Sequence, residues 1–428
     1  MERNDDGVVL LLGSGRQLYR EYLIKGLAQR AGLWLIDEQA PTWQSPYIVG
    51  ATVVRPLDHE RMAPDQRGLI DAAVELAQDR KVIGVVTYDE PLVIAAAHVA
   101  EALGVRGLTV SGARNCRDKH RSRTALTAAG LPQPGFALAR TLDEATRAAD
   151  RIGYPLVLKP RGMAASIGVV RATRPAGLAE AFAIVERARR AGPPAFEDGV
   201  LIEELVEGPE ISIDGAVSAG DYRPFCLARK RLGSPPYFEE VGHMVDAVDP
   251  LAADPGLWSL LAEAHEALGV PDGITHTEVR LTARGPVIIE VNARLGGDLI
   301  PYLGLLATGV DPGCVAADVA IGTPPDVGQQ ARRCAGIRFL YPPEDCRVLG
   351  VSVPEAGKIP GLVATCAMVP PGAFVRLPPR AHIGRHAFVI ATADTPGACE
   401  EVLDEASALV RLRYEPLEDP ELFDGPPL

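Results

Sequence analysis

The sequence predicts an α/β domain at the N-terminus followed by α+β segments. Residues 7–110 alternate short apolar runs with amphipathic stretches, a pattern typical of a parallel sheet flanked by helices. After about residue 115 the apolar runs are joined by loops and by one hairpin turn, which favours an α+β arrangement. With 428 residues, 47% of them apolar, the chain is long enough for two or three domains.

The elements of the first segment follow in order. "GVVLLLGSG" predicts a buried strand and a glycine turn, and "RQLYREYLIKGLAQRAG" has helical spacing. "LWLID" and "KVIGVVTYD" predict two further strands, and "PLVIAAAHVAEALGV" predicts a helix. The turn "GSGRQ" lacks the full GxGxxG pattern of a dinucleotide site. We therefore interpret it as a tight strand-to-helix turn.

The later segments are more varied. "NCRDKHRSRTALTAAGLPQPGFAL" predicts a charged helix with a proline-rich exit, and "YPLVLKPRGMAASIGVVRA" a strand, a flexible loop and a strand. "GVLIEELVEGPEISIDGAV" predicts two more strands. From about residue 328, "CAGIRFLYPPEDCRVLGV", "AFVIATAD" and "GACEEVLDEASALVRLRYE" predict an α+β cap. The expected domains are 1–115, 116–327 (a small subdomain at about 130–205 and a larger part at about 206–327) and 328–428.

Composition excludes several classes of function. A formal net charge of −13 argues against a nucleic-acid surface. No window approaches ~18 uninterrupted apolar residues, so no membrane span is expected. The N-terminus lacks the basic start and small-residue cleavage site of a signal peptide. The seven cysteines show no CxxC spacing, which indicates reduced thiols in a cytoplasmic setting rather than disulfides or a zinc site.

Residues 273–298 predict a hairpin with an oxygen-rich face. Glu290 and Asn292 lie two apart on the second strand and so share a face, and the hairpin register places Glu278 roughly opposite Glu290. Two carboxylates and an amide oxygen suit magnesium held between protein and substrate phosphates. Arg294 follows on the same parity, where it can meet an anion. The alternative, an ordinary solvated strand face, is disfavoured by the apolar residues between these side chains.

A second set of residues suits phosphate groups. Lys159 ends the apolar strand "YPLVL", so it places a cation at the edge of a cleft. The loop that follows is rich in small residues and can donate backbone N–H groups to phosphates, although a solvated turn is the alternative. The loop residues considered are Arg161, Gly162, Ser166 and Gly168. Lys119 in "RDKHRSR" is a further candidate cation, with a helix-surface charge as its alternative.

The stretch "LIEELVEGPE" can accommodate a base and a sugar. A flat base needs apolar walls and a few polar partners at its edge, which Leu205, Val206, Glu203 and Glu204 provide. The carboxylate of Glu210 can accept hydrogen bonds from two ribose hydroxyls. Taken alone, this stretch is equally well a charged loop.

In this order the motifs resemble those of the ATP-grasp superfamily, over roughly residues 1–325. The resemblance implies a Rossmann-like N-terminal domain and two α+β subdomains that grip ATP, with Mg²⁺ (or Mn²⁺) as the metal. It implies that Lys119 and Lys159 hold the α- and β-phosphates and that the loop from Arg161 to Gly168 is a mobile lid. The implied metal ligands are Glu278, Glu290 and Asn292. The implied base and ribose contacts are Glu203, Glu204, Leu205, Val206 and Glu210; Lys230 is expected near the γ-phosphate.

Further features resemble the bacterial L-amino-acid ligases and carnosine-type synthases. They are His276 beside Glu278, the loop "SPPYFEEVGHMV", and the turn at Gly296 and Gly297 before a helix. The resemblance implies an ATP-dependent carboxylate–amine ligase that joins amino acids through an acyl phosphate and releases ADP and phosphate. Arg294, Lys159 and His276 are the expected catalytic residues. The expected substrate contacts are Tyr237, Glu240, His243, Arg294, Gly296 and Gly297.

Other interpretations stay open. His276 can be a satisfied strand histidine, and His382 and His386 have no assigned role. A carboxylase of the biotin-carboxylase or purine type would activate bicarbonate with the same ATP apparatus. A nucleotide-binding regulator without catalysis is the alternative of a different class. The resemblance also implies small-molecule amino-acid substrates, a natural-product pathway and a homodimer as expectations, with no nucleic-acid or membrane partner.

Overall fold

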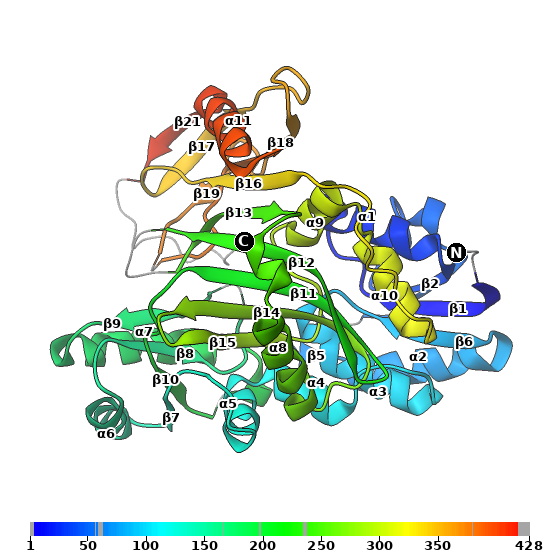
Figure 1. Cartoon of the computed structure of the whole chain (residues 1–428), viewed down its shortest axis with the longest axis horizontal. Coiled ribbons are helices and arrows are strands. Elements are labelled where there is room, and N and C mark those ends of the chain that lie inside the picture. The colour runs from blue at the N-terminus through cyan, green and yellow to red at the C-terminus, as the bar shows by residue number, and fades with distance from the viewer. Residues whose placement is uncertain are drawn as a thin grey trace.

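The computed structural model describes residues 4–55, 57–58, 63–164, 166–196, 198–233, 238–378 and 380–417. Figure 1 shows the N-terminal sheet, in blue, beside a long central sheet. The N-terminal sheet is parallel, with strand order β3-β2-β1-β6. Its strands are β1 (Asn4–Leu12), β2 (Ala31–Asp37), β3 (Gly50–Val53) and β6 (Val82–Val86). Leu10, Leu11 and Leu12 are fully buried, so the apolar run at the N-terminus is a core strand.

Helices alternate with these strands, as the sequence predicts. They are α1 (Gln17–Ala28), α2 (Gln66–Asp79) and α3 (Val93–Leu103). The "GSG" segment turns the chain from β1 into α1, with positive φ angles of 72° at Gly13 and 65° at Gly15. Glycine adopts this backbone region without the steric cost that other residues incur. Short elements in the connections are η1 (Ser45–Tyr47), η2 (Glu90–Leu92), β4 (Leu57–Asp58) and β5 (Ala63–Pro64).

The charged stretch after residue 110 forms two helices rather than one. They are α4 (Val110–Arg117) and α5 (Lys119–Ala128). Asp118 separates them with an extended backbone, and its side chain accepts hydrogen bonds from the N–H groups of His120 and Arg121. An aspartate that caps a new helix in this way competes with continuation of the preceding one. The break places Lys119 at the first turn of α5.

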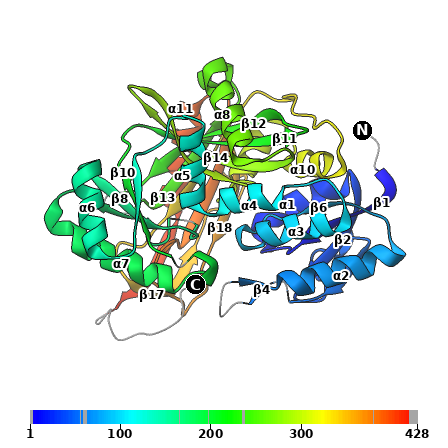
Figure 2. The same ribbon diagram turned by 90° about the horizontal axis from the view of Figure 1, so that it is seen from below.

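A small antiparallel sheet follows, with strand order β7-β10-β8-β9. Its strands are β7 (Phe136–Ala139), β8 (Leu156–Pro160), β9 (Val170–Ala172) and β10 (Val200–Glu204). Helices α6 (Leu142–Ile152) and α7 (Leu178–Arg190) pack on it, with the short turns η3 (Pro175–Gly177) and η4 (Pro194–Phe196) nearby. The sheet and helices share an apolar cluster of their own that includes Leu158, Val185 and Ile202. Figure 2 shows this unit and the N-terminal sheet at opposite ends of the molecule.

The central sheet has the strand order β15-β14-β11-β12-β13-β16-β20-β18. Its first five strands are β11 (Glu210–Ser218), β12 (Asp221–Leu232), β13 (Glu240–Asp246), β14 (Gly273–Thr282) and β15 (Gly285–Asn292). The helices connected with them are η5 (Pro250–Ala253), α8 (Pro255–Leu268), α9 (Ile300–Thr308) and α10 (Pro312–Ile321). The predicted hairpin is therefore the edge of this sheet.

The C-terminal region extends the central sheet. It adds β16 (Cys334–Leu340), β18 (Leu362–Ala367) and β20 (Ala387–Ala393), and β16 pairs with β13. Helix α11 (Pro396–Leu409) covers these strands, and a further sheet is formed by β17 (Cys346–Ser352), β19 (Phe374–Val375) and β21 (Arg411–Pro416). The α+β character is as predicted, but the region is joined to the central sheet rather than set apart as a cap. The domain limits at 115 and 327 stay a prediction.

Helix α10 connects the N-terminal sheet with the central sheet. A Cβ atom added to Gly313 would lie 2.2 Å from the main-chain oxygen of Leu23 in α1, so α1 and α10 touch backbone to backbone. One apolar cluster accordingly includes residues of β1, α1, α10 and β16. Among the described residues no single helix has the length and apolarity to cross a membrane; α9 and α10 pass such a test only as a pair bent by 102°.

Candidate functional site

An open cleft lies between the small sheet and the central sheet. Its walls come from β8, β10, β12, β14, β15, the start of α5 and the C-terminal region. Most of the predicted site residues line it: Lys119, Lys159, Ser166, Glu203, Glu204, Leu205, Val206, Glu210, Lys230, Glu240, His276, Glu278, Glu290, Asn292, Arg294 and Gly297.

Lys159 belongs to a buried triad with Glu203 and Arg123. Its Nζ lies 2.7 Å from a carboxylate oxygen of Glu203, and Nε of Arg123 lies 2.7 Å from the other. Burial lowers the pKa of Lys159. Burial alone would raise the pKa of Glu203, but the two cations outweigh it and hold the pKa below its ordinary value. Glu203 therefore stays ionised and keeps the charge of Lys159 at the cleft.

Lys119 reaches the cleft from the first turn of α5. Its Nζ lies 3.0 Å from Glu290 and donates to the main-chain oxygen of Met163 at 2.6 Å. Burial works to raise the pKa of Glu290, but Lys119 and Lys159 outweigh it and lower the pKa to about 2. Sequence reasoning alone left Lys119 as a possible surface charge; the structure places it 7% exposed beside Glu290.

The predicted oxygen-rich face is present on β14 and β15. Glu278 pairs in register with Glu290, and His276 pairs with Asn292. Burial and the neighbouring carboxylates raise the pKa of Glu278, although Lys230 opposes them. Carboxylates that crowd together in a buried cleft favour a cation between them. Two carboxylates and one amide oxygen match the ligands that Mg²⁺ prefers, so this donor set fits that ion.

Lys230 on β12 connects three carboxylates. Its Nζ lies 2.7 Å from Glu210, 2.6 Å from Glu240 and 3.0 Å from Glu278. These acids raise the pKa of Lys230 far above its ordinary value despite its burial. Glu210 also pairs with Arg280 at 2.6 Å. Each oxygen of Glu210 is thus paired with a cation of the protein. The prediction that Glu210 binds the ribose hydroxyls did not foresee these two partners.

Three described residues of the predicted lid loop line the cleft. Met163, Ala164 and Ser166 line the cleft, and Ser166 has a positive φ of 57°. Arg161 and Gly162 do not line it.

Arg161 pairs instead with Asp118, its Nε donating at 3.0 Å, because the break between α4 and α5 leaves that carboxylate beside it. A Cβ on Gly162 would lie 2.2 Å from the Phe196 ring, so this glycine packs against η4. The N–H of Gly168 donates to Nε2 of His382 at 3.4 Å, again outside the cleft lining.

The predicted base-side residues form the link between β10 and β11. Glu204, Leu205 and Val206 line the cleft, and the N–H of Leu205 donates to the oxygen of Pro155 at 3.1 Å. The side chain of Glu204 pairs with exposed Arg284 at 3.1 Å. The link therefore offers apolar walls, while Glu204 lies at the rim.

Arg294 is held by a residue that the sequence analysis missed. Its Nε lies 2.5 Å from one oxygen of Glu90, and the other oxygen lies 2.9 Å from Arg117. Glu90 is the first residue of η2, in the N-terminal segment, and is 9% exposed. The separation between Glu90 and Arg294 in the sequence leaves no local pattern that could link them.

His276 is fixed by a second missed residue, Asp214 on β11. One oxygen of Asp214 lies 2.8 Å from Nδ1 of His276 and accepts the N–H of Gly296 at 2.9 Å. This occupies the N–H of Gly296, which was expected to meet a substrate carboxylate. A Cβ on Gly296 would lie 2.7 Å from the His276 ring, so close packing also requires glycine here. Of the two glycines, Gly297 lines the cleft.

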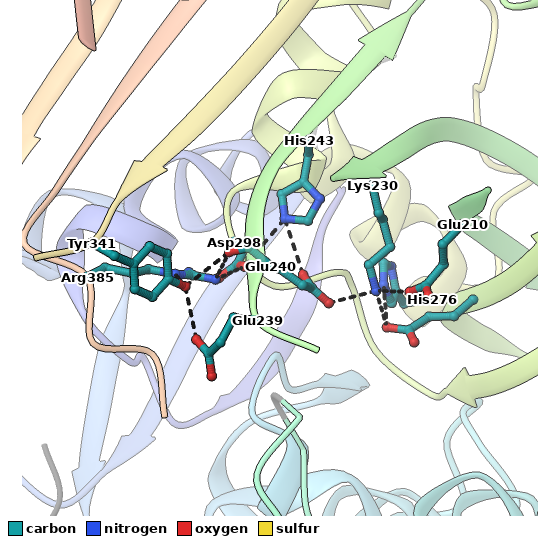
Figure 3. A network of polar contacts seen from close by, with 10 residues as sticks. Glu210, Lys230, Glu239, Glu240, His243, His276, Asp298, Tyr341 and Arg385 are labelled. Carbon is teal, nitrogen blue, oxygen red and sulfur yellow. Dashed lines mark hydrogen bonds and ion pairs between the residues drawn. The ribbon is translucent and has the colours of Figure 1, made fainter. Parts of the chain in front are cut away.

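At the far end of the cleft, Glu240 of β13 and Asp298 of the turn before α9 meet at His243, as Figure 3 shows. Nε2 of His243 lies 3.3 Å from Glu240 and 3.4 Å from Asp298. Burial disfavours the charged ring, yet these two acids outweigh it and raise the pKa of His243. Arg385 pairs with Asp298 at 2.6 Å. Predicted residue Tyr237 lies outside the described residues, and His243 lies behind the cleft wall rather than on it.

Two protein-family models match parts of this chain. A model of the ATP-grasp domain matches residues 152–301, and a model of the L-amino acid ligase C-terminal domain 2 matches residues 338–415. The chain belongs to the ATP-grasp superfamily and is of the L-amino-acid ligase type. The first matched segment includes Lys159, the predicted lid loop and the hairpin that carries the predicted metal ligands, and the second includes Arg385.

Individual relatives are distant. The alanine–anticapsin ligase of Bacillus subtilis (strain 168) is 29% identical over 265 residues, which are 57% of this chain and 55% of that enzyme. The dapdiamide A synthase of Enterobacter agglomerans is 30% identical over 193 residues, 44% of each chain. The matched part thus spans about half the length of these relatives. The structure of an L-amino acid ligase from Bacillus licheniformis has a TM-score of 0.78 at 22% identity, covering 97% of this chain and 100% of that one, which shows the shared ATP-grasp fold.

Proposed function

We propose that this protein joins two amino acids, or an amino acid and a small amine or acid, in an ATP-dependent reaction that passes through an acyl phosphate. The observation that carries the proposal is that two lysines, the oxygen-rich face and Arg294 converge on one cleft. The similarity to alanine–anticapsin ligase and dapdiamide A synthase supports amino-acid substrates and a role in natural-product synthesis.

The residues divide the chemical work. Glu278, Glu290 and Asn292 would hold Mg²⁺, which neutralises charge on the nucleotide phosphates when it is bound. Lys119 and Lys159 hold the phosphates, and Arg294 holds the phosphoryl group at its transfer to a substrate carboxylate. ADP leaves at this step. A neutral amine then attacks the acyl carbon, phosphate leaves, and the nitrogen loses its proton.

Each cation is paired with an acid of its own. Lys119 faces Glu290, Lys159 faces Glu203, and Arg294 faces Glu90 at 2.5 to 3.0 Å. In a buried cleft an unpaired lysine loses its proton, because desolvation disfavours the charged form. The pairing therefore preorganises positive charge where the transferred phosphoryl group needs it. His276, fixed by Asp214 with Nε2 3.8 Å from Glu278, would orient that carboxylate.

A carboxylase remains the second candidate within the superfamily. A carboxyphosphate site has to be small and strongly basic, because bicarbonate is a small anion. The far end of this cleft instead carries Glu240 and Asp298 together with the apolar side chains of Phe238 and Ile383. That lining favours an organic amine-bearing substrate over bicarbonate.

The decisive experiment screens pairs of amino acids for ADP and phosphate release and identifies products by mass. We expect ADP release that requires both amino acids and Mg²⁺, together with a dipeptide mass. Glu290→Gln is the matched control, since it keeps the shape of the side chain but removes a metal-binding charge. ADP release that depends on bicarbonate and needs no amino acid would replace the proposal with a carboxylase. ATP binding without turnover for any pair would favour a regulator.

A further inference from the structure

The C-terminal region sends one arginine, Arg385, into the wall of the cleft. NH1 and NH2 of Arg385 donate to the two oxygens of Asp298 at 2.6 and 2.7 Å. NH2 also donates to the main-chain oxygen of Glu240, and Nε donates to the hydroxyl of Tyr341, both at 2.9 Å. The guanidinium carbon lies 3.7 Å from the centre of the Phe339 ring. One side chain thus fixes two walls that lie far apart in the sequence.

The backbone at Asp298 has an unfavourable conformation that neighbouring residues must stabilise. Asp298 and Leu299 have positive φ angles of 53° and 61°, a backbone region that residues with a side chain seldom occupy. Such a conformation persists where the surroundings determine it. The forked, two-bond contact from Arg385 supplies that constraint and fixes the direction of the Asp298 carboxylate.

Around this point the two acids are more exposed than the cations that pair with them, Lys230, His243 and Arg385. The side chains of Glu240 and Asp298 are 21% and 22% exposed, whereas Arg385 is 4% and His243 is 0% exposed. One carboxylate oxygen of Glu240 and one of Asp298 lie within 4.8 Å of each other. A single ammonium group with ordinary hydrogen bonds of about 2.8 Å reaches both oxygens.

We propose that Arg385 positions Glu240 and Asp298 so that both carboxylates receive the free ammonium group of an amino-acid substrate. This inference rests on the proposed ligase function and narrows it, because it assigns the amino-acid subsite partly to the C-terminal region. Arg385 is a positioning residue, since it makes four hydrogen bonds within the protein, two of them to Asp298. The substrate at this subsite is a free amino acid rather than an N-acylated one or a simple carboxylic acid.

The test separates the KM for the amino acid from the KM for ATP in the full-length enzyme. In Arg385→Gln we expect the KM for one amino acid to rise about tenfold or more, the usual effect of losing charge-assisted hydrogen bonds. The KM for ATP should stay within twofold. Arg385→Lys keeps the charge but not the fork, so its KM should lie between those of wild type and Arg385→Gln.

A matched control lies in the same region of the chain. Arg338 on β16 pairs with Glu400 and Asp404 and does not line the cleft. Arg338→Gln therefore removes a comparable ion pair, and both KM values should stay unchanged. If Arg338→Gln raises the KM for the amino acid as much as Arg385→Gln does, the effect is one of general stability and the inference fails.

A second measurement addresses the ammonium group directly. The wild type should bind an N-acetylated amino acid at least about tenfold more weakly than the free one, as a competitive inhibitor, and Asp298→Asn should narrow that difference. Should Arg385→Gln fail to fold, Asp298→Asn decides through the same two KM values. An active wild type together with an unchanged amino-acid KM in Asp298→Asn overturns the subsite and leaves the ligase function standing. Absence of amino-acid-dependent ADP release in the wild type overturns the function itself.

Discussion

Replacing Glu203 with glutamine should destabilise the small sheet markedly. The carboxylate of Glu203 lies 2.7 Å from both Lys159 and Arg123, and all three residues are less than 5% exposed. At an effective dielectric constant of 20, each such contact corresponds to about 6 kcal/mol of Coulomb attraction. Breaking a buried pair by removing one partner typically costs roughly 3–5 kcal/mol.

We expect Glu203→Gln to lower the free energy of unfolding by about 3 kcal/mol, near the lower end of this range, because glutamine still offers one oxygen as an acceptor. Arg123 also keeps its bond to the main-chain oxygen of Ile289, at 2.6 Å. Urea unfolding followed by circular dichroism measures the loss, and hydrogen exchange in β8 and β10 locates it. Glu204→Gln is the control, since Glu204 pairs with an exposed arginine and should cost less than about 1 kcal/mol. Equal unfolding midpoints for the two variants would refute the reasoning.

The pH dependence gives an independent check. In Glu203→Gln, Lys159 retains the burial that lowers its pKa below the value of 10.5 in the unfolded chain, and loses the acid that opposes it. Between the folded and unfolded pKa values the unfolded chain binds more protons, so stability rises with pH there. The difference in unfolding free energy between the wild type and Glu203→Gln should therefore become smaller as the pH is raised from 7 towards 10. A difference that grows over this range would contradict the assignment of Lys159.

Three further outcomes are expected. Arg294→Lys keeps the charge but loses the forked geometry, so kcat should fall roughly 10²-fold or more while the Kd for ATP changes little; full activity in this variant would remove Arg294 from the mechanism. Amide hydrogen exchange in residues 161–168 should slow when Mg²⁺ and ATP are added, because lid closure excludes water. Identical exchange with and without nucleotide would argue against a lid. The nucleotide product should be ADP with one equivalent of phosphate, and stoichiometric AMP would exclude an acyl phosphate.

The hairpin that carries the predicted metal ligands could be predicted because its information is local. Side chains two apart on a strand share a face, and a short turn sets the register, so Glu278 and Glu290 were expected opposite each other and are found in register. The apolar run before Lys159 likewise placed that cation at the end of a strand. Both inferences need only a few neighbouring residues.

The partners of the predicted residues could not be found in this way. Glu90, Asp214 and Arg385 each act on a side chain that is distant in sequence, and their own surroundings carry no recognisable motif. The partner of Arg161 was missed for a related reason: Asp118 became available only because a helix ended there, and the contact of Arg161 with ATP stays a prediction. Long-range ion pairs follow from the packing of whole elements, which single-sequence patterns do not report.

The separate apolar cluster of the small sheet has a mechanical consequence. Leu158, Val185 and Ile202 belong to a core that the unit formed by β7–β10, α6 and α7 keeps to itself. Such a unit can swing as a rigid body, since opening the cleft leaves the interior of the unit dry. Substitutions inside that interior should alter the rate at which the unit unfolds. Substitutions in its two connections, near residues 129–135 and 205–209, should instead alter how fast nucleotide enters and leaves.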